Sequence, residues 1–578
     1  MAAGTFAYAT CFRGVFALDD VRAVVRNESI RSLWPLSGPL SPPGRSTVAG
    51  RPVANLSFAI NYALAGVSTP FTGPDPVREP GGLDPAPFHA VNLVIHLLAA
   101  VTLFGVVRRT LLTPSLAPAF GGSSLWMAMA VALVWVVHPL TTAAVTYVVQ
   151  RVESLMAFFY LLTLYCSIRA SGGTRTGWWT AAAVASCALG MATKEAMVTA
   201  PVLVAAWRWL FVPADALGAR RRGRVLMPGL FATWAVLAWL VSGERRGPSL
   251  DLGWDASWVY LLAQAEIVVH YLRLALVPSP LVFLYDWPLG TSLGAVAWQA
   301  ALLAALLGLT AVGLVRRHPA SFLGAWFFLV LAPSSSILPI VTEVAAEHRM
   351  YLPLAAVIAA VVSGAVLLGR RGIPSRKASL GVAAITVMTV VGVLAAETRE
   401  RNRVYWSAES LWEDTVAKRP KDARARVAYG EALAQAARPA EAEAQLRVAM
   451  ALAPDDPAAR VRLGAVLAQQ RRFDEAIPHL ERAVALRPDD PDARRFLADA
   501  FAAQGQDVAA VRQLEQALGI MPGDPRLMAR LAMLLAGSRD PLVRNLARAR
   551  ELARDAVRLT GGRDPRLLNV LAAAEAAR

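Results

Sequence analysis

The chain has 578 residues and a formal net charge of +16; 56% of its residues are hydrophobic and only 17% are charged. Because ordinary globular chains carry about a quarter charged residues, this composition excludes a string of soluble domains. The charges are also uneven, with 45 in residues 1–397 and 55 in the shorter segment 398–578. Neither part has a basic stripe on a soluble face, which argues against nucleic acid as a partner. We therefore expect an all-α chain with a membrane part and a soluble tail.

Ten apolar runs reach the length that a bilayer-spanning helix needs, roughly 17–25 residues. They are 88–110, 124–144, 152–170, 178–194, 196–212, 226–243, 293–315, 321–341, 350–369 and 377–396. The first twenty residues resemble the end of a further span, so we expect about eleven spans with the first truncated. The run 258–277 is ambiguous, because Glu266, His270 and Arg273 would lie on one helical face. We interpret this run as a helix in the membrane interface.

Basic residues predict the orientation of these spans. In the eleven-span arrangement the loops on one side contain 15 basic residues, including Arg220–Arg222, and one acidic residue, Asp215. The rest of residues 1–397 contains 13 basic and 16 acidic residues. Because cytoplasmic loops are enriched in Lys and Arg, we expect a multi-pass inner (cell) membrane protein. Residues 398–578 would then lie on the periplasmic side.

The tail contains an internal repeat of 34 residues, marked by Pro420, Pro454, Pro488 and Pro522. Small residues recur between the prolines, namely Gly430, Gly464 and Ala498, then Ala442, Ala476 and Ala510, then Ala449, Ala483 and Ala517. This pattern resembles the tetratricopeptide repeat. We predict a linker helix over 398–419 and a repeat domain over 420–578. That domain would have three clear repeats, a divergent fourth with about five extra residues and a capping helix near 565–578. Stacked repeats present a concave surface for a protein or peptide; the alternative is that they only brace the membrane domain.

Ionisable residues of the membrane part collect at the predicted outer face. They are Asp19, Asp20, Arg51, Arg151, Glu153, Lys194, Glu195, Glu347, His348 and Arg349. An ionisable group at a membrane costs free energy, so it indicates a function. A carboxylate can act as a general base toward a hydroxyl, and Arg or Lys can hold a phosphate leaving group. This combination favours sugar transfer from a lipid phosphate, with solvated loop charges as the simpler alternative.

Several motifs in one order point to a known family. The segments FALDDVRAVVRNESI, VVHPLTTAAVTYVVQRVESL, ATKEAMVTAPVLV and EHRMYLPLA resemble the transmembrane-and-tetratricopeptide-repeat family of protein O-mannosyltransferases and its bacterial relatives. The resemblance implies the fold of the C superfamily of glycosyltransferases. It also implies a dolichyl- or polyprenyl-phosphate sugar as donor on the non-cytoplasmic side, and an acidic catalytic pair that matches Asp19 and Asp20.

These observations together predict a glycosyltransferase that moves a sugar from a lipid phosphate to a hydroxyl, on protein, by inversion or retention. We expect Asp19 to be the general base, with Asp20 orienting it or binding a divalent ion. The expected residues for the lipid phosphate and substrate are Arg51, Arg151, Lys194, Glu195, Glu347, His348 and Arg349. The first alternative is a non-catalytic membrane scaffold whose repeats recruit proteins. The second is a transporter, which would favour ionisable groups at the bilayer midplane rather than at span ends.

Overall fold

The computed structural model describes the chain except residues 45, 66–82, 173–174, 214–216, 243–253, 290–291, 336–342, 373–375, 561, 563–564 and 577–578. Within the described ranges every regular element is helical, and the only strand-like pairing is an isolated bridge between Tyr285 and Ala345. The predicted all-α class is therefore confirmed. The chain forms two compact units, Met1–Leu411 and Trp412–Arg578. Residues 398–411, which we predicted to belong to a linker, are part of the first unit.

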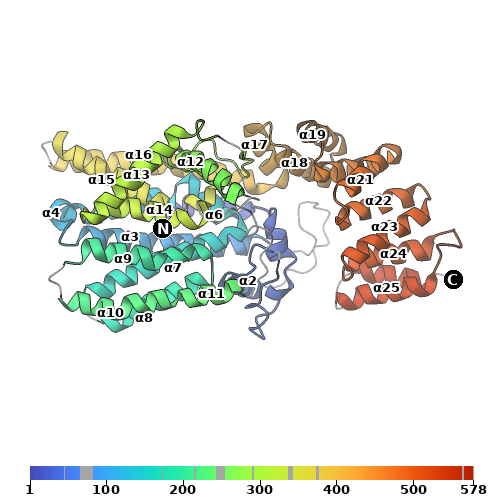
Figure 1. Cartoon of the computed structure of the whole chain (residues 1–578), viewed down its shortest axis with the longest axis horizontal. Helices are drawn as coiled ribbons and strands as arrows, with labels where there is room; N and C mark the ends of the chain where they lie inside the picture. The colour runs from blue at the N-terminus through green and yellow to red at the C-terminus, as the bar shows by residue number, and fades with distance from the viewer. Residues whose placement is uncertain are drawn as a thin grey trace. The chain divides into compact units, whose positions relative to one another are not determined.

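The first unit is a bundle of long helices that lie roughly parallel to one another (Figure 1). Its helices are α1 (Ala2–Ala7), α2 (Pro52–Ala65), α3 (Ala86–Leu111), α4 (Ala117–Phe120), α5 (Ser124–Val136), α6 (Thr142–Thr146), α7 (Arg151–Ser171), α8 (Thr176–Met191), α9 (Ala200–Phe211), α10 (Leu217–Ala232), α11 (Trp234–Ser242), α12 (Trp254–Leu276), α13 (Ala297–Val315), α14 (Ser321–Ser335), α15 (Leu354–Gly372) and α16 (Arg376–Arg403). Short 3-10 and π turns connect them, including η7 (Glu195–Thr199) directly before α9.

Seven helical segments in the described part of the chain are long and apolar enough to cross a membrane. They are Ala86–Leu111, Ala117–Val136, Val148–Ser171, Gly223–Ser242, Trp258–Leu276, Ala297–Val315 and Gly381–Trp406. Six of them match predicted spans. The segment Trp258–Leu276, which we interpreted as interfacial, is the seventh; more than half of it is buried, and Tyr260 donates a hydrogen bond to the Ser334 carbonyl of α14. By length and composition this helix also qualifies as a span, so its interfacial placement stays a prediction.

The other predicted spans correspond to shorter helices. Helix α8 has 16 residues, α9 has 12 and α14 has 15, while the apolar part of α15 ends at Arg370. In the predicted span 196–212, the first turn is the 3-10 helix η7 instead of α-helix. The seven qualifying helices support a membrane location, and the total of about eleven spans stays a prediction.

The N-terminal segment packs against the end of α16 and the loops before α7. The Val15 amide donates to the Tyr405 carbonyl at 3.0 Å, and the Trp406 indole donates to the Thr10 carbonyl at 2.8 Å. A buried aromatic cluster that includes Phe16, Phe58 and Phe88 lies beneath this segment. Burial of large apolar side chains stabilises such a loop by roughly 1.5–3 kcal/mol each. The loop that carries the acidic pair is thereby held on the bundle.

The second unit is a stack of helix pairs with the predicted period. Its helices are α17 (Ala408–Lys418, which begins within the first unit), α18 (Ala423–Gln435), α19 (Pro439–Leu452), α20 (Pro457–Gln469), α21 (Phe473–Leu486), α22 (Pro491–Ala503), α23 (Asp507–Ile520), α24 (Pro525–Gly537), α25 (Leu546–Leu559) and α26 (Pro565–Ala576). Gly430 and Gly464 permit close helix packing, since a Cβ at either position would lie 2.6 or 2.5 Å from Cγ of Leu446 or Leu480. The divergent fourth repeat is present as α24 and α25, and α26 packs on both.

Candidate functional site

The adjacent carboxylates Asp19 and Asp20 have opposite environments. Asp20 is completely buried and accepts hydrogen bonds from the backbone amides of Ala17, at 2.9 Å, and Val149, at 2.6 Å. Burial raises the pKa of the Asp20 carboxyl, and the two backbone donors oppose that rise. Asp19 is exposed, and it follows Leu18, whose φ of 39° turns the chain sharply. Asp20 therefore ties the loop to the start of α7, while the Asp19 side chain faces outward.

Tyr147 connects this loop to a third carboxylate. Its hydroxyl accepts a hydrogen bond from the Asp19 amide at 3.0 Å. Burial, and then the charges of Asp20, Asp19 and Glu343, raise the pKa of the Tyr147 hydroxyl. The side chain of Glu343 is 37% exposed, so Glu343 is a second accessible carboxylate whose charge acts on Tyr147.

Two ion pairs join the loop before α2 with the turns at α7 and α9. Arg51 donates to both carboxylate oxygens of Glu195, at 2.9 and 3.2 Å, and to the Thr47 carbonyl at 2.6 Å. Lys194 donates to the Glu153 carboxylate in the first turn of α7. The cations of these pairs are only 16% and 11% exposed, so each pair is largely shielded from water. The predicted neighbours Lys194 and Glu195 thus pair with distant residues and not with each other.

The motif Glu347, His348 and Arg349 is buried, and each side chain has different contacts. Glu347 accepts from the Val282 amide and from the Tyr285 hydroxyl, the latter at 2.8 Å. Burial, with the positive charges of Lys194, Arg349 and Arg51, lowers the pKa of His348. His348 is therefore neutral near pH 7 and lies close to the two ion pairs.

Arg349 and Arg151 are enclosed by protein groups. Arg349 donates to the Ser334 and Val344 carbonyls at 2.9 and 3.1 Å. Arg151 has no exposed surface. Its guanidinium donates to Asn92 Oδ1 and Asn61 Oδ1, each at 2.6 Å, and to the backbone carbonyls of Ser57 and Phe88. These contacts join α2, α3 and α7 and leave little of either guanidinium available to a ligand.

The structure thus brings most of the predicted residues to the same side of the bundle but separates them by role. Asp19, Arg51 and Lys194 retain accessible surface. Asp20, Arg151, Glu347 and Arg349 hold loops together. The sequence interpretation missed Tyr147 and Glu343 and gave Glu153 no role. Glu343 lies four residues before Glu347 in the same motif, which was the available signal; nothing in the sequence connects Tyr147 with Asp19.

The divalent ion predicted at Asp20 would need several side-chain donor atoms close together. Both oxygens of Asp20 already accept backbone hydrogen bonds. Among the residues that the structure describes, no three His, Cys, Asp or Glu side chains lie close enough together to hold a metal ion. The donor set around Asp19 and Asp20 therefore does not fit a metal site. The described residues offer accessible carboxylates at Asp19 and Glu343, two shielded ion pairs and a neutral histidine.

The chain is similar to named transferases and to repeat proteins. Family models described as tetratricopeptide repeat match residues 394–457 and 467–534. Protein O-mannosyl-transferase TMTC4 of Mus musculus is 26% identical over 486 residues, covering 74% of this chain and 62% of the relative. Protein O-mannosyl-transferase Tmtc2 of Drosophila melanogaster is 27% identical over 292 residues, covering 47% of this chain and 28% of the relative.

Among solved structures, a thermophilic tetratricopeptide-repeat protein of Thermus thermophilus is 18% identical; the match covers 32% of this chain and 94% of that chain, with a TM-score of 0.26. The predicted resemblance to the transmembrane-and-tetratricopeptide-repeat family of O-mannosyltransferases is confirmed by the matches to its members. The chain spans about 62% of the length of the first curated relatives it matches.

Proposed function

We propose that this protein is a membrane glycosyltransferase that transfers a sugar from a polyprenyl-phosphate donor to a hydroxyl acceptor on protein. The observation that carries the proposal is that the two residues of the acidic pair have opposite environments. Asp20 is buried and holds the loop, whereas the neighbouring Asp19 is exposed. The similarity to proteins named O-mannosyl-transferases supports the reaction class.

Asp19 is the proposed general base. Its carboxylate accepts the proton of the acceptor hydroxyl while the hydroxyl oxygen forms a bond to the anomeric carbon of the sugar. The bond between that carbon and the phosphate oxygen breaks, and the lipid phosphate leaves with the electron pair. A positioned base accelerates such a step by about 10²–10⁴-fold. The Tyr147 hydroxyl accepts a hydrogen bond from the Asp19 amide and so positions the backbone that carries this carboxylate.

Arg51 and Lys194 are the proposed residues for the lipid phosphate. The guanidinium of Arg51 has a donor left for such a ligand. Its Nε is buried and has no hydrogen-bond partner among the described residues. A phosphate oxygen would satisfy this donor, and Arg can hold phosphate through two parallel hydrogen bonds. Glu195 and Glu153 orient the two cations. Burial and the charges of Lys194, Arg349 and Arg51 lower the pKa of His348, so this residue adds no further positive charge near pH 7.

The repeat unit is proposed to bind the protein acceptor, since stacked helix pairs commonly present a binding surface for peptides. The distribution of basic residues supports the periplasmic location of this unit and of the Asp19 side of the bundle. Both proposals can fail while the transferase proposal survives, because sugar transfer to a small hydroxyl compound requires neither of them.

The test uses the purified full chain in lipid nanodiscs, with radiolabelled polyprenyl-phosphate hexoses as donors and a Ser/Thr-rich peptide or an alkyl alcohol as acceptor. We expect the wild-type protein to release lipid phosphate and to label an acceptor, and Asp19→Asn to do neither. Glu28→Gln is the matched control, because Glu28 is another exposed carboxylate of the same N-terminal segment. Absence of turnover by wild type with every donor, together with specific capture of proteins by the repeats, would favour the scaffold alternative.

A further inference from the structure

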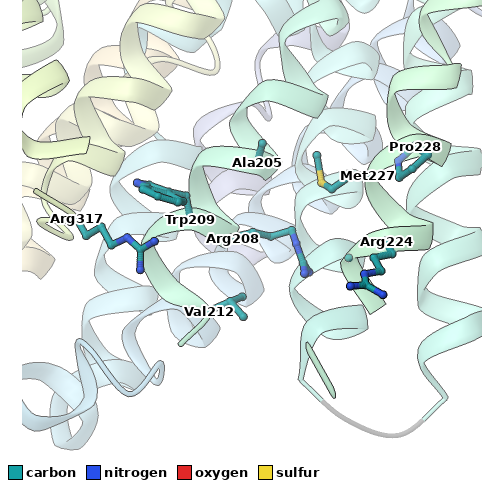
Figure 2. A pocket seen from close by; sticks show the side chains of 9 residues that line it. Ala205, Arg208, Trp209, Val212, Arg224, Met227, Pro228 and Arg317 are labelled. Atoms are coloured by element: carbon teal, nitrogen blue, oxygen red, sulfur yellow. The ribbon is translucent and has the colours of Figure 1, made fainter. Parts of the chain in front are cut away.

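A basic cavity lies at the end of α9 that is farthest from Lys194 and Glu195. Helix α9 has 12 residues, so its two ends are about 18 Å apart. The cavity has a volume of about 580 Å³ and lies between the end of α9, the middle of α10 and the loop after α13 (Figure 2). A volume in this range is large enough for a small-molecule head group. The cavity is therefore separate from the site around Asp19.

Three arginines from three different elements line this cavity, and none of its nine lining residues is acidic. Arg208 lies between Arg317 and Arg224 in the view of Figure 2. Arg208 donates to the Ser171 hydroxyl at 2.6 Å, which fixes its guanidinium. Gly223 permits this position, since a Cβ there would collide with the Arg208 guanidinium. The sequence thus leaves space for the arginine at the cavity wall.

The other two arginines add charge, and neither has an acidic partner among the residues that the structure describes. The Arg317 guanidinium lies over the Trp209 ring at 3.8 Å, and the Trp209 indole donates to the Leu314 carbonyl at 2.9 Å. Arg224 is exposed and makes no hydrogen bond or ion pair with any residue the structure describes. Three guanidinium groups around one cavity favour a phosphate, which arginine binds through paired hydrogen bonds.

The remaining wall of the cavity is apolar and continues into a membrane-facing helix. Met227 and Pro228 of α10 line the cavity. They belong to the candidate span Gly223–Ser242, of which only 17% is buried inside the bundle. Further along this span Phe231 and Trp239 are exposed, the latter by 73%. A ligand with a phosphate in the cavity could therefore extend acyl chains along this face, as basic pockets between transmembrane helices do for anionic lipids.

We propose that Arg208, Arg224 and Arg317 form a binding site for the phosphate of an anionic phospholipid whose acyl chains lie along α10 and α11. The cavity holds the head group, the exposed apolar face of the span holds the chains, and the site is independent of sugar transfer. The ligand is a lipid and not free phosphate, because half of the cavity wall is apolar and adjoins the bilayer.

The test is native mass spectrometry of the full chain with added dioleoylphosphatidylglycerol, compared with dioleoylphosphatidylcholine. If each arginine near the membrane surface contributes about a factor of five, the double variant Arg224→Gln, Arg317→Gln should weaken phosphatidylglycerol binding about 25-fold. The matched control is Arg108→Gln, Arg316→Gln, which removes two arginines that do not line the cavity. It should bind like wild type, and both variants should unfold at the wild-type temperature.

Three results would overturn the proposal. The first is equal binding of phosphatidylglycerol by the cavity variant and the control. The second is equal retention of phosphatidylcholine by the wild-type protein, which would remove the need for an anionic head group. The third is displacement of phosphatidylglycerol by millimolar inorganic phosphate, which would assign the cavity to a soluble anion.

Discussion

The two units of the molecule use charged residues in different ways. In residues 1–411 two shielded ion pairs join distant parts of the chain: Arg51 and Glu195 are 144 positions apart, and Lys194 and Glu153 are 41 positions apart. In residues 412–578 many pairs are local and exposed, as in Arg438 with Glu441, which are 48% and 57% exposed. Exposed pairs contribute little to stability, whereas breaking a buried pair leaves an uncompensated charge. The two shielded pairs therefore hold distant parts of the first unit together, whereas the exposed pairs of the second unit add little to its stability.

The largest loss of stability is expected from replacing Arg151, a buried cation of the first unit. Arg151→Met keeps much of the side-chain volume but leaves the oxygens of Asn92, Asn61 and Phe88 without this donor. At roughly 1–3 kcal/mol for each unsatisfied buried group, the variant should lose several kcal/mol of unfolding free energy. Thermal unfolding in mild detergent measures this loss, with exposed Arg108→Met as the control. Equal unfolding temperatures for the two variants would remove the structural role of Arg151.

In the second unit the largest effect is expected from packing and not from charge. Gly464→Ala would place a Cβ 2.5 Å from Leu480 Cγ, and overpacking costs about 1–3 kcal/mol. The control is Gly519→Ala in α23, where a Cβ would meet nothing within 4 Å; it should be neutral or slightly stabilising, because Ala favours helix. Limited proteolysis of the full chain against temperature measures both. Similar protease resistance of the two variants would contradict the close approach of α20 and α21.

The smallest effect, and the sharpest contrast, is expected from double-mutant cycles on one ion pair of each unit. The Arg438–Glu441 cycle should give a coupling of about 0.2–1 kcal/mol that falls with added salt. The Lys194–Glu153 cycle should give a larger coupling that changes little with salt, since these side chains are 11% and 5% exposed. Couplings of the same size and salt dependence would show that the shielding of the membrane-unit pair has no energetic consequence.

The repeat unit could be predicted closely because its contacts recur at a fixed local spacing. The glycine positions and the divergent fourth repeat were read from the sequence. The helix N-caps were missed, although Asp422, Asp456, Asp490 and Asp524 have the same 34-residue spacing and each accepts a backbone hydrogen bond. A side-chain oxygen at this position satisfies an N–H group of the first helical turn, so this pattern could have been found.

The membrane unit could be predicted only in part. Long apolar runs identified most of the spans, but three of the ten are helices of 16 residues or fewer. The 3-10 helix η7 lies between α8 and α9, and hydropathy does not distinguish such a segment from α-helix. The ionisable residues of the site were found because charge is rare in this part of the chain. Their partners were not, since the pairing of Asp19 with Tyr147 spans 128 positions and follows no period.

The central claim is that Asp19 performs chemistry while its neighbour Asp20 holds the loop. The most direct measurement compares Asp19→Asn with Asp20→Asn for both sugar transfer and thermal unfolding in the same preparations. Asp19→Asn should lower transfer about 10²–10⁴-fold at the wild-type unfolding temperature, because this side chain is exposed. Asp20→Asn should lower the unfolding temperature, because one of its two backbone donors would lose a carboxylate acceptor. Wild-type transfer by Asp19→Asn, or unchanged unfolding of Asp20→Asn, would contradict the account.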